Sequence, residues 1–329
     1  MSIVLLGPQR RPSLDKIVTA LGLPGPFVTI TAGWQEREKD DADLDRHLLE
    51  RSRNLHLWHR MQHVFEVDPE YALAHHARRA QLLELQGLYQ LGLSHTVKFL
   101  EELRHRTTGS AGRRELAVQD AIGVFRGIDR QHIARVREIQ GRFYAEYPPH
   151  ERPAIVQHRQ EVAALMADAS AVVLAGGHVV ELLDALHLFN VTATGLNRLP
   201  IIAWSAGAMA LTSQVVLFDE HAVRGPGCAE VFDQGLGVLP GLALFPAARQ
   251  RLRTGDKQNM GLLARRFAPS LCVPLDPGAR VEIGDDGSLP ADAPVVDFEG
   301  TMGPLADAVG VRAVSEGGER GQAGDQPTA

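Results

Sequence analysis

Short apolar runs that end near small residues, each followed by a helical pattern, constrain the fold of this chain more than any other feature. Continuous apolar runs of this length are typical of strands buried on both faces of a sheet. They occupy residues 2–7, 26–33, 170–177 and 199–204. Helical patterns follow at residues 13–22, 178–189 and 205–211. This alternation predicts a three-layer α/β fold with a mostly parallel sheet.

A long segment, about residues 41–150, interrupts the alternation. It has helical periodicity, as in the leucines at 82–93, and almost no strand pattern. A break is expected near Thr107–Gly112, and the paired prolines at 148–149 end the segment. The sequence therefore predicts a large helical insertion after the second strand.

The rest of the chain returns to the α/β pattern. Residues 214–218 and the segment 235–246 predict further strands, and residues 280–298 predict a terminal β-hairpin. We expect a single α/β domain over residues 1–315 and a disordered tail over residues 316–329.

Composition and charge narrow the classes of partner. The net charge of −6 argues against a nucleic-acid binder that relies on positive charge. Cys228 and Cys272 are too distant to form a zinc motif or a disulfide framework. The loop 225–237 has neither a P-loop lysine nor a dinucleotide fingerprint. No apolar run approaches the length of a membrane span. We therefore expect a cytoplasmic protein with no metal, cofactor, nucleic-acid partner or membrane partner.

Ser205 is the main candidate for chemistry. It follows the apolar run 201–204 and is followed by Ala206, Gly207 and Ala208, so a sharp strand-to-helix turn is possible there. Such a turn presents a serine hydroxyl at the carboxyl end of a strand, beside the free N–H groups of a helix start. The alternative is that these small residues only pack a helix closely on the sheet.

The segment 172–178 strengthens the catalytic interpretation. It is a buried strand that ends in Gly176 and Gly177 at the start of a helix. In a parallel sheet its carboxyl end lies at the same edge as that of the Ser205 strand, where ligands bind. A glycine pair at that edge can supply one more N–H to an oxyanion.

Three segments together resemble a known family. The stretches 171–186, 201–211 and 235–246 are similar in order and spacing to the serine peptidase family of dipeptidase E and cyanophycinase. The resemblance covers about residues 151–300 and implies a class I glutamine amidotransferase-like fold, with serine in place of cysteine. It also implies peptide or isopeptide hydrolysis, and so a small peptide or amino-acid-derived substrate.

The resemblance assigns roles to individual positions. Ser205 matches the nucleophile, and the N–H groups of Ala206 and Gly177 match the oxyanion donors. Glu220 or Asp219 falls where the family places its acidic residue. The segment 275–287 resembles the closing hairpin of the family, although Pro277 stands where an acidic residue is common.

The histidine of the family is missing from its expected place, which Ala247 occupies. A serine hydroxyl is a poor nucleophile near neutral pH unless a base accepts its proton. Three explanations stay open: a natural loss of the base, a different base, or an engineered replacement of a histidine. The chain is therefore either a serine hydrolase that uses another base or an impaired pseudoenzyme that binds a ligand or partner.

Other histidines offer weaker candidates. His178 and His221 are candidate substitute bases or substrate contacts; the alternatives are a helix cap for His178 and an exposed loop residue for His221. His56, His59 and His63 have helical spacing, but we interpret them as surface or core residues because no acidic residue completes a metal site. The helical insertion is expected to serve as a lid over the pocket or as a surface for forming a homo-oligomer.

Overall fold

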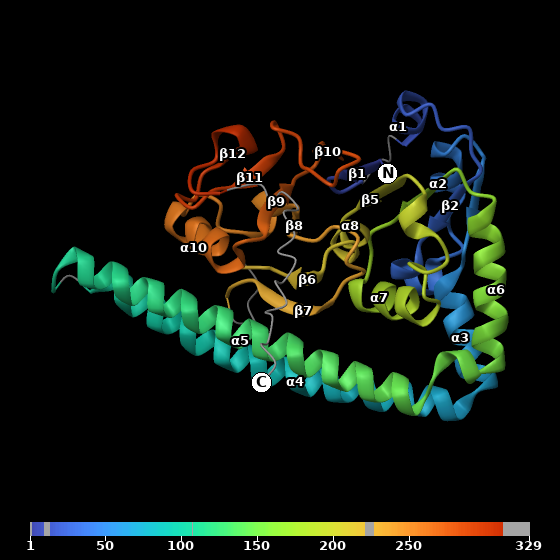
Figure 1. Ribbon diagram of the computed structural model, residues 1–329, viewed down its shortest axis with the longest axis horizontal. Helices are drawn as coiled ribbons and strands as arrows, with labels where there is room; N and C mark the ends of the chain where they lie inside the picture. Colours follow the sequence, from blue (N-terminus) through green and yellow to red (C-terminus); the bar gives the residue numbers. More distant parts are fainter. Residues whose placement is uncertain (1, 10–13, 107, 221–226, 312–329) are drawn as a thin grey trace, which may run out of the picture.

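A six-stranded sheet forms the centre of the molecule in the computed structural model, which describes residues 2–9, 14–106, 108–220 and 227–311 (Figure 1). The strand order is β10-β1-β5-β4-β2-β3. β10 is antiparallel to β1, and every other neighbouring pair is parallel. The strands span β1 Ile3–Leu6, β2 Phe27–Ile30, β3 Ser52–Asn54, β4 Ala171–Leu174, β5 Ile201–Trp204 and β10 Arg280–Ile283.

Helices cover both faces of this sheet, as the sequence predicts for a mixed α/β fold. The helices of the α/β layers span α1 Leu14–Ala20, α2 Ala42–His47, α3 Leu57–Val67, α6 Pro153–Ala167, α7 Val179–Leu188, α8 Ala206–Ala210, α9 Ala248–Arg251 and α10 Lys257–Phe267, of which α10 packs on the smaller sheet of β9 and β11. Short 3₁₀ helices span Ala32–Arg37, Pro149–Glu151, Leu196–Arg198 and Leu305–Asp307.

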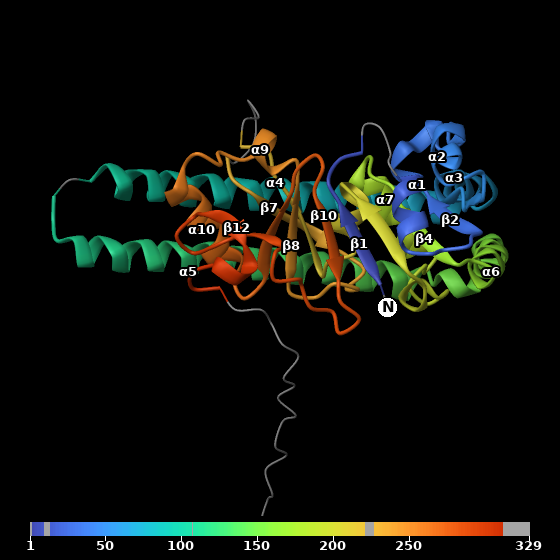
Figure 2. The ribbon, with the colours of Figure 1, turned by 90° about the horizontal axis from the view of Figure 1, so that it is seen from above.

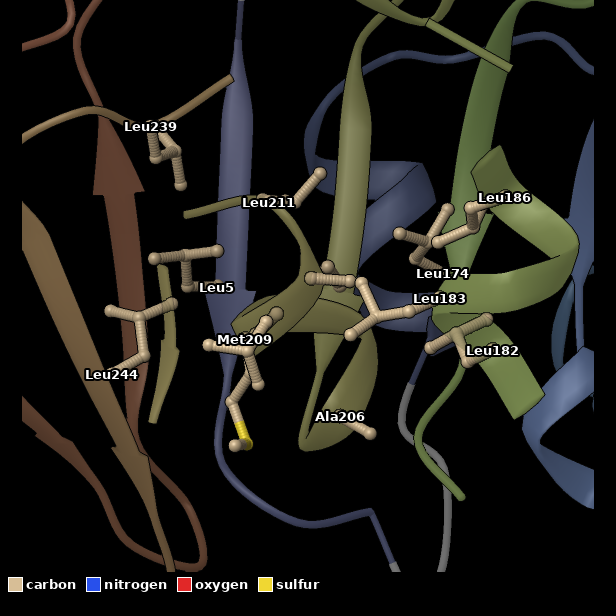
Figure 3. Close-up of a cluster of buried hydrophobic side chains, with 14 of the residues drawn as sticks. Leu5, Leu174, Leu182, Leu183, Leu186, Ala206, Met209, Leu211, Leu239 and Leu244 are labelled. Atoms are coloured by element: carbon tan, nitrogen blue, oxygen red, sulfur yellow. The ribbon is translucent and has the colours of Figure 1, made fainter. Parts of the chain in front are cut away.

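Side chains of the central strands alternate between two apolar cores. In β5, Ile201 and Ala203 belong to the core that contains α7 and α8, whereas Ile202 and Trp204 belong to the core that contains α1 and α2. This period of two explains why the strands read as continuous apolar runs. Figure 3 shows leucines of α7 meeting Leu174 of β4 and the side chains of α8. This packing fixes the helix that follows Ser205.

Two smaller sheets complete the strands. In the four-stranded sheet, β8 (Leu242–Pro246) runs parallel to β9 (Leu271–Leu275). On the other side of β9 lies β11 (Pro294–Val296), which pairs with β12 (Met302–Pro304). β6 (Gln214–Leu217) and β7 (Glu230–Gln234) form an antiparallel ribbon. The predicted hairpin over residues 280–298 is wrong, because β10 pairs with β1 while β11 pairs with β9 and β12. Local alternation cannot reveal that two successive strands join different sheets.

The predicted insertion at 41–150 is partly helical and partly sheet. β3 lies within it and pairs with β2 at the edge of the central sheet. The part that leaves the α/β layers is a helical hairpin of α4 (Pro69–His105) and α5 (Ala111–Glu146). The hairpin runs along one side of the molecule and its tip extends past α10 (Figures 1 and 2). The predicted tail at 316–329 lies outside the described residues. Among the described residues, no helix has the length and apolar character needed to cross a bilayer.

Two buried ion pairs fasten this hairpin to the body. Arg78 of α4 donates to Asp184 of α7 at 2.6 Å. Arg266 of α10 makes two bonds to Asp129 of α5, at 2.7 and 2.8 Å. Because Asp184 is in the helix that begins beside the Ser205 loop, the first pair connects the hairpin to the site region.

Buried histidines of the hairpin predict a loss of stability in mild acid. Burial holds the pKa of His75 and of His132 below the usual 6.5. For His75, burial together with the nearby Arg78 and Arg79 outweighs Asp184, which lies 3.5 Å from Nε2 and raises the pKa. These rings stay neutral in the folded state and gain protons on unfolding. Stability is therefore fully present above about pH 6.5 and falls as the pH drops below it. Urea unfolding between pH 7.5 and pH 5.5 should show this decline, with a shallower slope in the double variant His75→Asn/His132→Asn; an equal slope would contradict the assignment.

Candidate functional site

Ser205 lies on a sharp turn between β5 and α8, and its side chain is half-buried. Its backbone has φ 51° and ψ −125°, a conformation that residues other than glycine rarely adopt. Such a backbone costs about 1–3 kcal/mol and persists only where the surrounding packing enforces it. The strain presents the hydroxyl at the carboxyl edge of the sheet instead of burying it in the core.

Two glycines make room for this turn. A Cβ on Gly176 would lie 2.6 Å from the Cβ and 3.3 Å from the Oγ of Ser205. A Cβ on Gly207 would lie 2.5 Å from the carbonyl oxygen of Leu174 and 2.7 Å from that of Ala175. The ends of β4 and β5 can therefore approach each other only with glycine at both positions.

A matched pair of glycine substitutions tests this close approach. Gly207→Ala should lower the free energy of unfolding by about 1–3 kcal/mol, because the added methyl group meets two backbone oxygens. Gly141→Ala in α5 should instead raise it by about 0.4–1 kcal/mol, since a Cβ there meets nothing within 4 Å. Urea unfolding of both variants measures the difference, and equal effects would argue against the crowding at Gly207.

The loop after β4 places Gly177 beside Ser205. Gly177 has φ +133°, and the N–H of His178 donates to the Gly33 carbonyl at 2.7 Å. Gly177 and Ser205 line the same two pockets. The Ala206 N–H belongs to the first residue of α8, so it has no intrahelical acceptor. Both sequence-predicted oxyanion donors therefore border the space around the serine.

His178 has the capping role that was the alternative to a catalytic one. Its Nδ1 accepts a hydrogen bond from the Glu181 N–H at 3.5 Å, at the start of α7. Within the described residues its ring makes no hydrogen bond to Ser205. His178 is exposed beside the Gly177 loop, so a substrate contact stays a prediction. His221 lies outside the described residues.

Ser205 stands where two open pockets meet. One, of about 810 Å³, extends toward Ala247, Gln250 and Arg251. The other, of about 500 Å³, extends toward Trp34 and Arg37. A ligand that crosses the serine would therefore have parts on both sides of the hydroxyl, as an acyl group and its leaving group do. Among the described lining residues of the larger pocket, Arg251 carries the only formal charge.

Ala247 lies on the wall of the larger pocket. It follows β8, caps α9 and has φ 57° and ψ 43°, in the left-handed region. Its N–H donates to the Leu275 carbonyl at 2.9 Å. Histidine is among the residues enriched in this left-handed region, whereas alanine is not. The backbone is thus suited to the imidazole that the sequence lacks.

The acidic candidates named from the sequence lie elsewhere. Both carboxylate oxygens of Glu220 accept from Asn259 Nδ2 at 2.9 Å, and one also accepts from the Arg253 N–H at 2.8 Å. Glu220 lines a small cavity beside α4 and α10 rather than the pockets at Ser205. Asp219 is exposed and lines neither pocket among the described residues. In this geometry Glu220 secures the loop after α9.

Asp276 is an acidic residue near Ala247 that the sequence analysis does not single out. It follows β9, the parallel neighbour of β8, and its carboxylate accepts from the Arg249 N–H at 2.9 Å. Arg249 is two residues after Ala247, and Pro277 and Gly278 line the Ser205 pocket. The carboxylate therefore stands beside the start of α9, where Ala247 is the cap. In the sequence, Asp276 directly precedes Pro277 in the segment 275–287.

The helically spaced histidines have separate partners. His59 Nδ1 lies 2.9 Å from the buried Glu38, whose carboxylate also accepts from the N–H groups of Trp58 and His59. His63 Nδ1 lies 2.9 Å from His158 Nε2. These contacts fit the interpretation as core and surface residues. Within the described ranges no group of three or more metal-ligating side chains is found.

The helical hairpin does not cover the site. Among the described residues, neither pocket at Ser205 has a lining residue from α4 or α5. The hairpin packs instead on β7, α10 and α3. The interpretation as a lid is therefore wrong for the α4–α5 hairpin, which lies along the side of the sheet. At the start of the predicted insertion, Asp43 and Leu44 of α2 do line the smaller pocket at Ser205.

Comparisons with known proteins add one likeness. No protein-family profile matches the chain, and a search of curated proteins returns no match. The crystal structure of a peptidase from an acI-B1 Actinobacterium is similar at a TM-score of 0.39 and 15% identity, over 95% of this chain and 96% of that chain. The fold and site define a mixed α/β protein with a serine on a strained strand–helix turn.

Proposed function

We propose that this chain is a serine hydrolase scaffold of the dipeptidase E and cyanophycinase type, with a class I glutamine amidotransferase-like fold. Its reaction is acyl transfer from a peptide or isopeptide amide to water. Ser205 attacks the carbonyl carbon, and the N–H groups of Ala206 and Gly177 bind the oxyanion. Turnover needs a base that accepts the Ser205 proton and passes it to the leaving amine. Position 247 is alanine, so the chain hydrolyses a peptide only if another group supplies that base.

The strained conformation of Ser205 carries this proposal. Packing alone does not require a serine at φ 51°, because a glycine would adopt that backbone without strain. The hydroxyl lies at the edge of the sheet, between two pockets. Glycines on both sides of it leave the space that a side chain would otherwise fill. Strain of this kind at a cleft is typical of active sites.

Covalent labelling of Ser205 tests the proposal. A fluorophosphonate probe should label the native chain slowly, because oxyanion stabilisation survives the loss of a base. Ser205→Ala should abolish the label, and peptide mapping should place it on Ser205. Labelling that persists in Ser205→Ala, or none in the native chain even at long times and high pH, would contradict a nucleophilic Ser205.

Ala247 favours a second candidate, a pseudoenzyme that binds a ligand or partner. Alanine in the left-handed region keeps the pocket open but supplies no base. Arg251 on the pocket wall suits an anionic group, so acidic dipeptides are the first ligands to test. A rise in the thermal midpoint with no hydrolysis would favour binding without catalysis. Hydrolysis that disappears in Ser205→Ala would favour the enzyme.

A further inference from the structure

We propose that α4 is a dimerisation helix, and that its exposed face pairs antiparallel with α4 of a second copy of this chain. This inference is independent of the chemistry at Ser205. It rests on apolar side chains that the folded chain leaves uncovered on one long helix.

Four leucines on the outer side of α4 are mostly exposed. The exposed fractions are 73% for Leu73, 75% for Leu83, 63% for Leu88 and 57% for Leu91. Figure 1 shows α4 and α5 along the lower edge of the molecule, with the α/β layers on their other side. The opposite face of α4, which includes Tyr89 and Leu93, is already used in the core of the hairpin. Leu73 and Leu91 are 18 residues apart, which is five helical turns, so they lie on the same face, and Leu83 and Leu88 lie to either side of it. A single exposed leucine needs no explanation, but an exposed apolar strip of this length indicates an interface.

The exposed row has the spacing of a helix-pairing seam. The positions alternate between steps of four and three residues, which is the heptad pattern of helices that pack side by side. They are Leu73, Ala77, Ala80, Glu84, Gly87 and Leu91. From Leu73 to Leu91 the row extends about 27 Å at 1.5 Å per residue.

In a parallel pair each seam residue would meet its own copy, so Glu84 would meet Glu84, whereas in an antiparallel pair Glu84 faces Ala80. With the two-fold axis at residue 82, Leu73 faces Leu91 of the second copy, and Ala77 faces Gly87. Leu83 then meets Leu83 of the second copy next to the axis. Each large residue of the outer pairs has a leucine opposite it, and the small pair lets the two backbones approach.

Gly87 is the helical glycine that lies within the exposed seam of α4. It interrupts a 37-residue helix, where glycine is unfavourable by about 1 kcal/mol relative to alanine in general helix measurements. A Cβ added to Gly87 would meet nothing within 4 Å. Close approach of a partner helix at this point would explain why the position is a glycine.

Charge also favours the antiparallel direction. The exposed Glu66, just before α4, and the exposed Lys98, near its end, are equally far from residue 82. Antiparallel pairing therefore brings Glu66 of one copy close to Lys98 of the other, whereas parallel pairing does not. The helix dipoles add to the same preference. Because one helix pair makes a small interface, we expect a reversible dimer.

Sedimentation velocity of the full chain over a concentration series tests the proposal. The native chain should shift from monomer to dimer as concentration rises. Leu83→Glu should raise the dissociation constant on the order of a hundredfold or more, because two carboxylates then meet near the axis. Gly87→Trp should have a similar effect by blocking close approach. Leu116→Glu, at a 65% exposed leucine of α5, is the matched control and should leave the dimer unchanged.

Cysteine cross-linking tests the direction of the helices. A mixture of Ala77→Cys and Gly87→Cys chains should form a disulfide-linked dimer under mild oxidation, and each variant alone should form little. Circular dichroism confirms that each variant is folded. A native chain that stays monomeric at all concentrations, a dimer that survives both Leu83→Glu and Gly87→Trp, or stronger cross-linking of either variant with itself would overturn the proposal.

Discussion

Replacing Ala247 with histidine should raise the rate of fluorophosphonate labelling of Ser205 by about 10²–10⁴-fold, the usual contribution of a positioned general base. The backbone at this position already has φ 57° and ψ 43°, which histidine accepts more readily than most residues. Ala247 and Ser205 line the same pocket, so an imidazole at 247 would enter the space beside the hydroxyl. The labelling rate should then depend on pH, rising as the imidazole loses its proton.

Asp276 provides the sharper part of this test. Its carboxylate lies at the start of α9, where it can orient an imidazole at position 247. In the Ala247→His background, Asp276→Asn should remove much of the gain, whereas Glu220→Gln should remove less because Glu220 lines a different cavity. Ser205→Ala should give no label in any background. No gain from Ala247→His in a folded protein would contradict the proposed role of position 247.

Removing the carboxylate of Asp129 should lower the free energy of unfolding by about 3–5 kcal/mol, which is the usual cost of leaving a buried charge without its partner. Arg266 is buried and donates twice to Asp129, as well as to the Ala229 carbonyl at 2.7 Å and Tyr89 Oη at 3.1 Å. Burial alone would lower the pKa of Arg266, but the nearby carboxylate outweighs it and keeps the pKa raised. Asp129→Ala therefore leaves a cation that cannot lose its proton in an apolar core.

Chemical denaturation of Asp129→Ala measures this loss, and the double variant Asp129→Leu/Arg266→Met is the control. Replacing both charges with apolar groups of similar size should recover most of the stability. If the double variant were as unstable as Asp129→Ala, loss of packing rather than an unpaired charge would explain the effect. The same pair fastens α5 to α10, so hydrogen exchange in α5 should increase in Asp129→Ala.

The local features of this protein were predictable from sequence because they depend on neighbouring residues. Buried parallel strands read as apolar runs since both faces are covered, and this pattern located β1, β2, β4 and β5. The turn at Ser205 was recognisable because its crowding demands small residues within a few positions. The break between α4 and α5 was recognisable for a similar reason, since turn-forming residues cluster there.

The features that failed depend on residues far apart in the chain. β3 is only three residues long and becomes a strand by pairing with β2, so its own pattern gave no signal. β10 and β11 read as a hairpin, yet each finds a better partner in another part of the chain. The sequence predicts the acidic residue at Glu220 or Asp219, whereas the parallel pairing of β8 with β9 brings the carboxylate of Asp276 to the start of α9.

The sequence by itself determined which short segments become strands and helices, and where a serine could occupy a strained turn. Those properties follow from burial patterns and backbone sterics within a few residues. Only the tertiary structure decided which carboxylate lies beside Ala247, that the hairpin avoids the pocket, and which face of α4 stays uncovered. These outcomes depend on long-range pairing and packing, in which segments separated by tens of residues compete for the same partners.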